Sequence, residues 1–78
     1  MTTTMDFPDL DMAVDQESYQ WLLDNAPLYA DAVAAEIKRG HKPADIRQRF
    51  MRTTQRAALA LRLEQAARHL QREQRSDS

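Results

Sequence analysis

The sequence contains no cysteine and only one glycine, Gly40. Without cysteine the chain forms no disulfide and offers no thiolate to a metal ion. With one glycine it cannot build a glycine-rich loop around a phosphate group. It also lacks an apolar run near the roughly 18 residues of a membrane span, and its start lacks the basic and apolar stretches of a signal peptide. These absences predict a cytoplasmic protein with no cofactor, no metal and no membrane contact.

Catalytic groups are equally scarce in the sequence. His41 and His69 lie far apart, and neither has an acid or a second histidine at ligand spacing. Glu64 and Glu73 lie in a basic segment, where glutamates are expected to pair with arginines such as Arg68 at i, i+4. The serines have no recognisable base beside them. We therefore expect a protein that is not an enzyme and has no catalytic residues.

Charge is abundant and is divided unevenly along the chain. Residues 1–40 hold eight acids and two bases, a net charge of −6, whereas residues 41–78 hold nine bases and four acids, a net charge of +5. This division indicates either that an acidic segment faces a basic one or that the basic half meets an anionic partner. Solvated helix faces are the simpler alternative. Arginine far exceeds lysine and alanine is the commonest residue, which favours a bacterial protein from a GC-rich genome.

Seventy-eight residues make one domain at most. A chain this short buries only about 60% of the surface that it exposes when unfolded, so such domains often need a partner chain. Residues 1–14 interleave acids with apolar residues and are expected to form a flexible acidic tail, which either frays or becomes ordered on a partner. Residues 15–75 are expected to form the single helical domain, and residues 76–78 a disordered end.

The spacing of apolar residues predicts an all-α fold. The first helix is expected over residues 16–25 with Asp15 as its N-cap, and the second over residues 28–39 with Gly40 just beyond its end. A third helix begins near Pro43, and neither glycine nor proline follows to end it. The expected core centre consists of Tyr19, Leu22, Val33, Ile37, Ile46 and Phe50, with Trp21 or Leu23 at its rim.

Two apolar stripes lie on opposite sides of this third helix. At about 100° per residue, Ile46 and Phe50 fall on one side and the neighbouring arginines largely on the other. Beyond Ala58 the pattern inverts, so that Leu59 and Leu63 occupy the side that the arginines held. One straight helix cannot place both stripes against a single core.

Two arrangements resolve this inversion. In the first, which we expect, the helix is continuous to about residue 72, and two short helices pack on its N-terminal half. Its second stripe then packs against another copy of the chain. In the alternative, the helix breaks near Thr53 and Thr54, and the remainder folds back as the fourth helix of a compact monomer.

The expected arrangement leads to a function in binding. Leucines left exposed on a continuous helix gain free energy when a partner covers them. We expect a small helical protein–protein interaction module, an adaptor, inhibitor or regulator that also self-associates as a homodimer. The sequence does not identify its protein partner. The predicted partner or dimer interface consists of Leu59, Leu61, Leu63, Ala66 and Leu70.

A helix-turn-helix DNA-binding regulator is the alternative function. Arg47, Gln48 and Arg49 lie in the first turns of the third helix, which is where residues that read base edges are found. Acids in the preceding helices and a net charge of −1 argue against this interpretation, so nucleic acid is the second choice of partner. The predicted nucleic-acid contacts are Arg47, Gln48, Arg49, Arg52 and Arg56.

Overall fold

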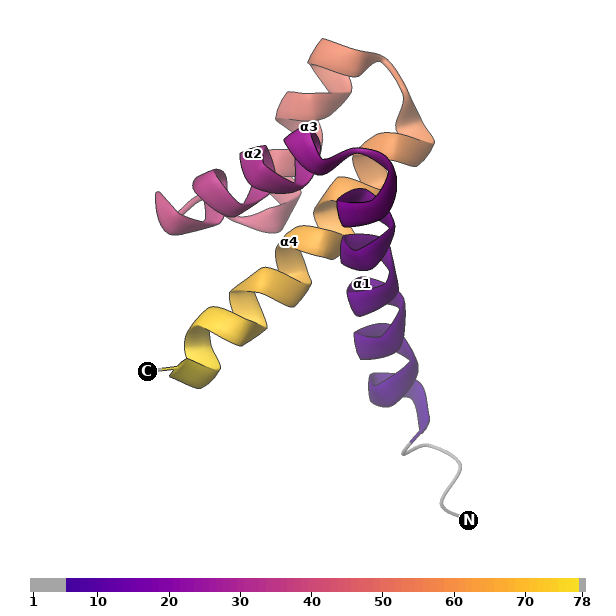
Figure 1. Cartoon of the computed structure of the whole chain (residues 1–78), viewed down its shortest axis with the longest axis vertical. Helices are drawn as coiled ribbons and strands as arrows, with labels where there is room; N and C mark the ends of the chain where they lie inside the picture. The colour runs from indigo at the N-terminus through magenta and orange to yellow at the C-terminus, as the bar shows by residue number, and fades with distance from the viewer. Residues whose placement is uncertain (1–5, 78) are drawn as a thin grey trace.

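A computed structural model describes residues 6–77, which form four α-helices and no strand (Figure 1). The helices are α1 (Asp6–Asn25), α2 (Pro27–Lys38), α3 (Pro43–Thr54) and α4 (Ala57–Asp77). The last of these runs across the molecule and contacts each of the other three. The predicted all-α class is therefore confirmed, with α4 as the helix on which the others assemble.

The first helix starts at Asp6, well before the expected start at Gln16, so that boundary was wrong. Asp15 is not an N-cap: it is buried within α1, and its Oδ2 lies 2.7 Å from Nη2 of Arg72 and 3.3 Å from Nε of Arg68. This pairing fastens α1 to α4, and the spacing of apolar residues does not reveal it. Residues 6–14 of the expected tail are helical, whereas residues 1–5 lie outside the described part of the chain.

The end of the second helix agrees with its prediction to within one residue. Gly40 has a φ of 92°, which is the left-handed conformation that favours glycine after a helix. The Gly40 N–H donates to the carbonyl of Ile37 (3.0 Å), and the His41 N–H donates to that of Glu36 (3.1 Å). These two bonds satisfy carbonyls at the helix end and turn the chain toward Pro43, the first residue of α3.

The expected continuous third helix was wrong, and the alternative of a break that gives a fourth helix is confirmed. The break comes just after the expected position, at Gln55, whose φ of 56° and ψ of 30° are left-handed. Its N–H donates to the carbonyl of Met51 (2.8 Å). The Thr54 hydroxyl donates to the carbonyl of Phe50 (2.8 Å) and accepts from the N–H of Arg56 (3.2 Å). Side-chain bonding by threonine thus replaces helical bonding at the break. The new helix reaches Asp77, so part of the expected disordered end is helical.

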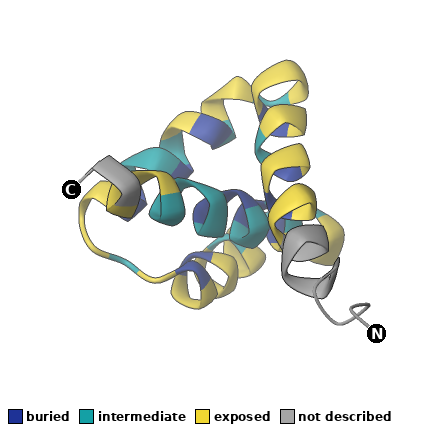
Figure 2. Ribbon diagram, turned by 90° about the horizontal axis from the view of Figure 1, so that it is seen from below, coloured by how far each residue is buried: buried dark blue, intermediate teal, exposed yellow. Residues whose placement is uncertain are grey.

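Reversing the chain at Gln55 brings both apolar stripes to one core, and Figure 2 shows the buried residues along the inner sides of the helices. Of the expected core centre, Leu22, Val33, Ile37 and Ile46 are buried, while Tyr19 and Phe50 are only partly buried. The other residues of the buried cluster are Ala30, Leu63, Ala66 and Ala67.

Two leucines of α4, two positions apart, give a direct test of this packing. Leu63 is fully buried, whereas Leu61 is 41% exposed. We expect Leu63→Ala to lower the free energy of unfolding by about 2–5 kcal/mol, because it leaves a cavity in the core. Leu61→Ala, the matched control, should change it by less than about 0.5 kcal/mol. Urea unfolding followed by circular dichroism measures both, and equal effects would contradict the observed orientation of α4.

Candidate interaction sites

The structure divides the predicted interface residues into buried and accessible ones. Leu63 and Ala66 are fully buried, and Leu59 and Leu70 pack against the same core. Of the five predicted interface residues, only Leu61 is exposed to solvent. The expectation that this stripe faces solvent was therefore wrong, because the fold-back of α4 covers it with the other helices of the same chain. The homodimer that was inferred from the stripe stays a prediction.

The predicted nucleic-acid contacts on α3 are partly engaged within the protein. Arg47 Nη1 lies 3.2 Å from Glu64 Oε1, and Glu64 also pairs with Arg68, as the i, i+4 spacing predicts. Arg49 Nη1 lies 3.1 Å from both carboxylate oxygens of Glu36. Arginines that already bind acids at close range are less able to contact bases or phosphates.

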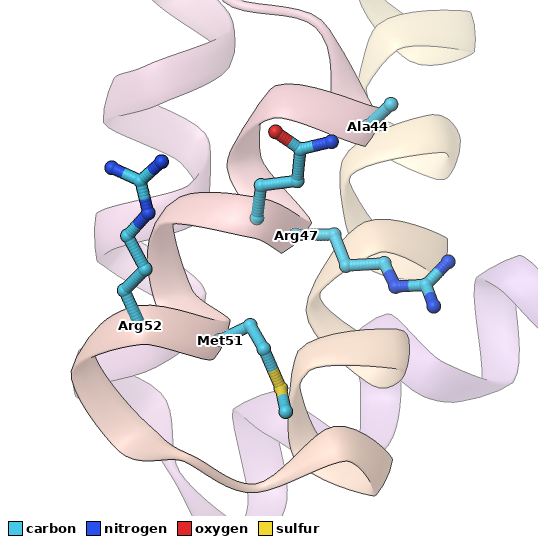
Figure 3. A pocket seen from close by; sticks show the side chains of 5 residues that line it. Ala44, Arg47, Met51 and Arg52 are labelled. Carbon is cyan, nitrogen blue, oxygen red and sulfur yellow. The ribbon is translucent and has the colours of Figure 1, made fainter.

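Of the predicted nucleic-acid contacts, Arg47, Gln48 and Arg52 line one depression on α3, whereas Arg49 and Arg56 do not. Figure 3 shows a shallow depression on α3, in which Arg47 and Arg52 point to opposite sides of the helix. Arg56 lies beyond α3, in the connection to α4. The depression has a volume of about 480 Å³ and is lined by Ala44, Arg47, Gln48, Met51 and Arg52.

This geometry predicts weak binding to DNA. In a gel-shift titration against random duplex at low salt, we expect no complex at micromolar protein. A contrary result would be tight binding whose affinity falls steeply with salt, because each neutralised phosphate releases counterions. If Gln48→Ala and Arg52→Ala weakened such binding and the control Lys38→Ala did not, α3 would be the reading helix.

Glu36 is the electrostatic centre of the α2–α3 junction. Its side chain is buried, with a hydrogen bond from Nδ1 of His41 and ion pairs to Arg39 (3.3 Å) and Arg49 (3.1 Å). The hydrogen bond with His41 lowers the pKa of Glu36, and the charge of Arg49 lowers it further, against the opposing effect of burial. Asp45 lies beside the same cluster. The ionised carboxylate therefore stabilises the turn that orients α3.

The lowered pKa of Glu36 predicts how stability depends on pH. A carboxyl group whose pKa is lower in the folded state than in the unfolded state stabilises the fold when the pH is above its unfolded pKa, which is about 4.3 for glutamate. This stabilisation is lost as the pH falls through the folded-state pKa. Urea midpoints should therefore show Glu36→Gln to be less stable than the natural protein at pH 7, with a difference that shrinks below about pH 4. Glu17→Gln, which removes one carboxyl group at an exposed position, is the control for the change in net charge. A difference independent of pH would contradict the assignment.

A more apolar groove lies where the α1–α2 connection meets the start of α4. It has a volume of about 620 Å³. We call it the Trp21 groove, and it is lined by Trp21, Asn25, Ala26, Tyr29, Arg56, Ala57, Ala58, Leu59 and Arg62. The sequence placed Trp21 at the rim of the core and gave no sign of this groove, because its walls come from segments that meet only after the break at Gln55.

The walls of the Trp21 groove combine aromatic rings with arginine. The guanidinium carbon of Arg62 lies 4.4 Å from the centroid of the Trp21 ring, a cation–π contact. Tyr29 meets Phe50 edge to face with ring centroids 5.9 Å apart, which joins the groove to the core. Trp21 itself is 36% exposed. The groove thus combines an apolar surface with a basic side chain that lies against its tryptophan.

Other chemistry is sparse in the described part of the chain. His41 pairs with Glu36, and His69 stacks on Tyr19 with centroids 5.3 Å apart. Among residues 12–75, whose side chains the structure describes, no group of three or more histidines and acids is placed to hold a metal ion. No helix there combines the length and apolar character needed to cross a membrane. No protein-family model, curated protein or solved structure matches the chain.

Proposed function

We propose that the protein is a small helical adaptor or regulator that binds a protein partner through the Trp21 groove. The observation that carries this proposal is the accessible aromatic floor of the groove, with Trp21 and Tyr29 beside the small side chains of Ala57 and Ala58. Tryptophan, tyrosine and arginine are the residues that most often dominate binding energy at protein interfaces. All three residue types line this groove.

The exposed part of Trp21 supports a useful binding energy. A tryptophan side chain offers up to roughly 250 Å² of surface, so an exposure of 36% leaves somewhat less than 100 Å² to be covered. Burying that area contributes about 2 kcal/mol, before the neighbouring apolar atoms are counted. Because the Arg62 guanidinium already lies against the ring, a partner loses less free energy in ordering it.

The groove takes the place of the leucine stripe as the proposed binding surface, while the class of function stays as predicted. A DNA-binding role has weaker support, because Arg47 and Arg49 are engaged with acids. We propose binding rather than catalysis, and the cytoplasmic location stays a prediction.

A capture experiment with matched variants tests the proposal. Ala58→Gln adds a neutral, bulkier side chain inside the groove, and Ala44→Gln makes the same change at an exposed position on α3. Immobilised natural protein and the Ala44→Gln control should capture the same host proteins, as measured by quantitative mass spectrometry. Ala58→Gln should lose at least about tenfold of that yield, a difference of about 1.4 kcal/mol in affinity.

Two results would contradict a groove-based binding function. One is equal capture by both variants, with circular dichroism showing that each is folded. The other is capture that disappears when the lysate is treated with nuclease, which would indicate a nucleic-acid partner instead.

A further inference from the structure

We infer that the Trp21 groove accepts an acidic amphipathic helix of its protein partner. This inference rests on the proposed function and adds the chemistry of the occupant. The charged residues that line the groove are of one sign, Arg56 and Arg62, and no acid lines it. A segment with apolar residues on one face and carboxylates beside them complements both parts of this surface.

The arginines of the groove differ from most others in the protein. Within the described residues, ion pairs with acids engage Arg39, Arg47, Arg49, Arg68 and Arg72. No ion pair there joins Arg56 or Arg62 to an acid. The basic charge beside the groove is thus not neutralised by a direct ion pair within the fold and is available to an incoming carboxylate.

Arg62 is also held in a geometry that suits a carboxylate. Its guanidinium group stacks over the Trp21 ring, with the guanidinium carbon 4.4 Å from the ring centroid. A guanidinium group can lie against an aromatic ring and still donate two parallel bonds to a carboxylate. Trp21 therefore provides apolar surface and positions the charge at the same time.

The start of α4 adds positive potential at the same place. Ala57, Ala58 and Leu59 form the first turn of the helix and line the groove, and that turn contains no acid. The N-terminal end of a helix carries a partial positive charge that favours nearby anions. Together with Arg56 and Arg62, it makes one side of the groove attractive to a carboxylate.

The architecture favours a helical occupant. Most of the groove lining comes from α1, α2 and α4, with Ala26 and Arg56 in the connections between helices. The part of the chain that the structure describes has no strand whose edge could pair with an extended peptide. An amphipathic helix enters such a groove with apolar residues at i, i+3, i+4 and i+7. A neutral proline-rich segment would contact the aromatic rings but would leave both arginines without acids.

Synthetic peptides test the inference directly. The acidic probe is a helix of about four turns with leucine and phenylalanine on one face and glutamate elsewhere, and the matched peptide has lysine at every glutamate position. A neutral proline-rich peptide is the third probe. Trp21 is the single tryptophan of the chain, so its fluorescence reports occupancy of the groove. The acidic helix should bind at least tenfold more tightly than the lysine helix, with an affinity that falls as salt rises.

Charge-reversal variants locate the binding on the groove. We expect Arg56→Glu and Arg62→Glu each to weaken binding of the acidic helix at least tenfold. Lys38→Glu makes an equal charge change at an exposed position outside the groove and should leave the affinity unchanged. Circular dichroism verifies that every variant is folded.

The possible failures separate the inference from the proposed function. If the acidic and lysine helices bind equally and Ala58→Gln abolishes both, the groove binds peptides but the acidic partner is wrong. Tighter binding of the proline-rich peptide would also overturn the inference of an acidic helix. So would the absence of binding of the acidic helix at tens of micromolar. In either case, capture from lysate that depends on the groove would still support the proposed binding function. Sedimentation equilibrium could instead show self-association of the protein that Ala58→Gln abolishes. That result would identify a second copy of the chain as the occupant and would overturn the inference of an acidic partner helix.

Discussion

The reversal of the chain at Gln55 is the constraint on which the rest of the structure depends. Before it, Ile46 faces the core from α3, and after it Leu63 faces the same core from α4. A left-handed conformation costs a residue other than glycine about 1–2 kcal/mol. Burial of one leucine contributes about 1.5–3 kcal/mol, so Leu63 alone is sufficient to offset that cost. The same reversal brings Arg56 and the start of α4 beside Trp21, which creates the groove.

Charge pairing sets how the helices meet around that core. Two buried acids of the first half of the chain pair with arginines of the second half, which agrees in part with one interpretation of the charge division. Asp15 of α1 pairs with two arginines of α4, and Glu36 of α2 pairs with Arg49 of α3. A buried carboxylate left without its partners is strongly destabilising, so these pairs disfavour other placements of the helices even where their net contribution to stability is small.

Structural features that depend on a short stretch of sequence, such as a helix end, could be predicted. Contacts between segments that are distant in the sequence could not. Gly40 marks the end of α2 by its own backbone preference, and Leu22 and Val33 lie on clear apolar faces. The pairing of α1 with α4 through Asp15 depends on arginines more than fifty positions away. The inverted stripe did predict two outcomes, but spacing alone did not choose between a second chain and a reversal. The Trp21 groove could not be predicted, because it exists only when the chain reverses at Gln55.

The central place of α4 has a consequence for how the protein is made. Within the described residues, α1 and α3 do not contact each other, and α2 touches each of them less extensively than it touches α4. The ribosome synthesises these three helices first, at a stage when they have no shared core to bury Leu22 or Val33. Folding therefore waits for α4 to emerge, and until then the nascent chain exposes apolar side chains of the kind that chaperones bind.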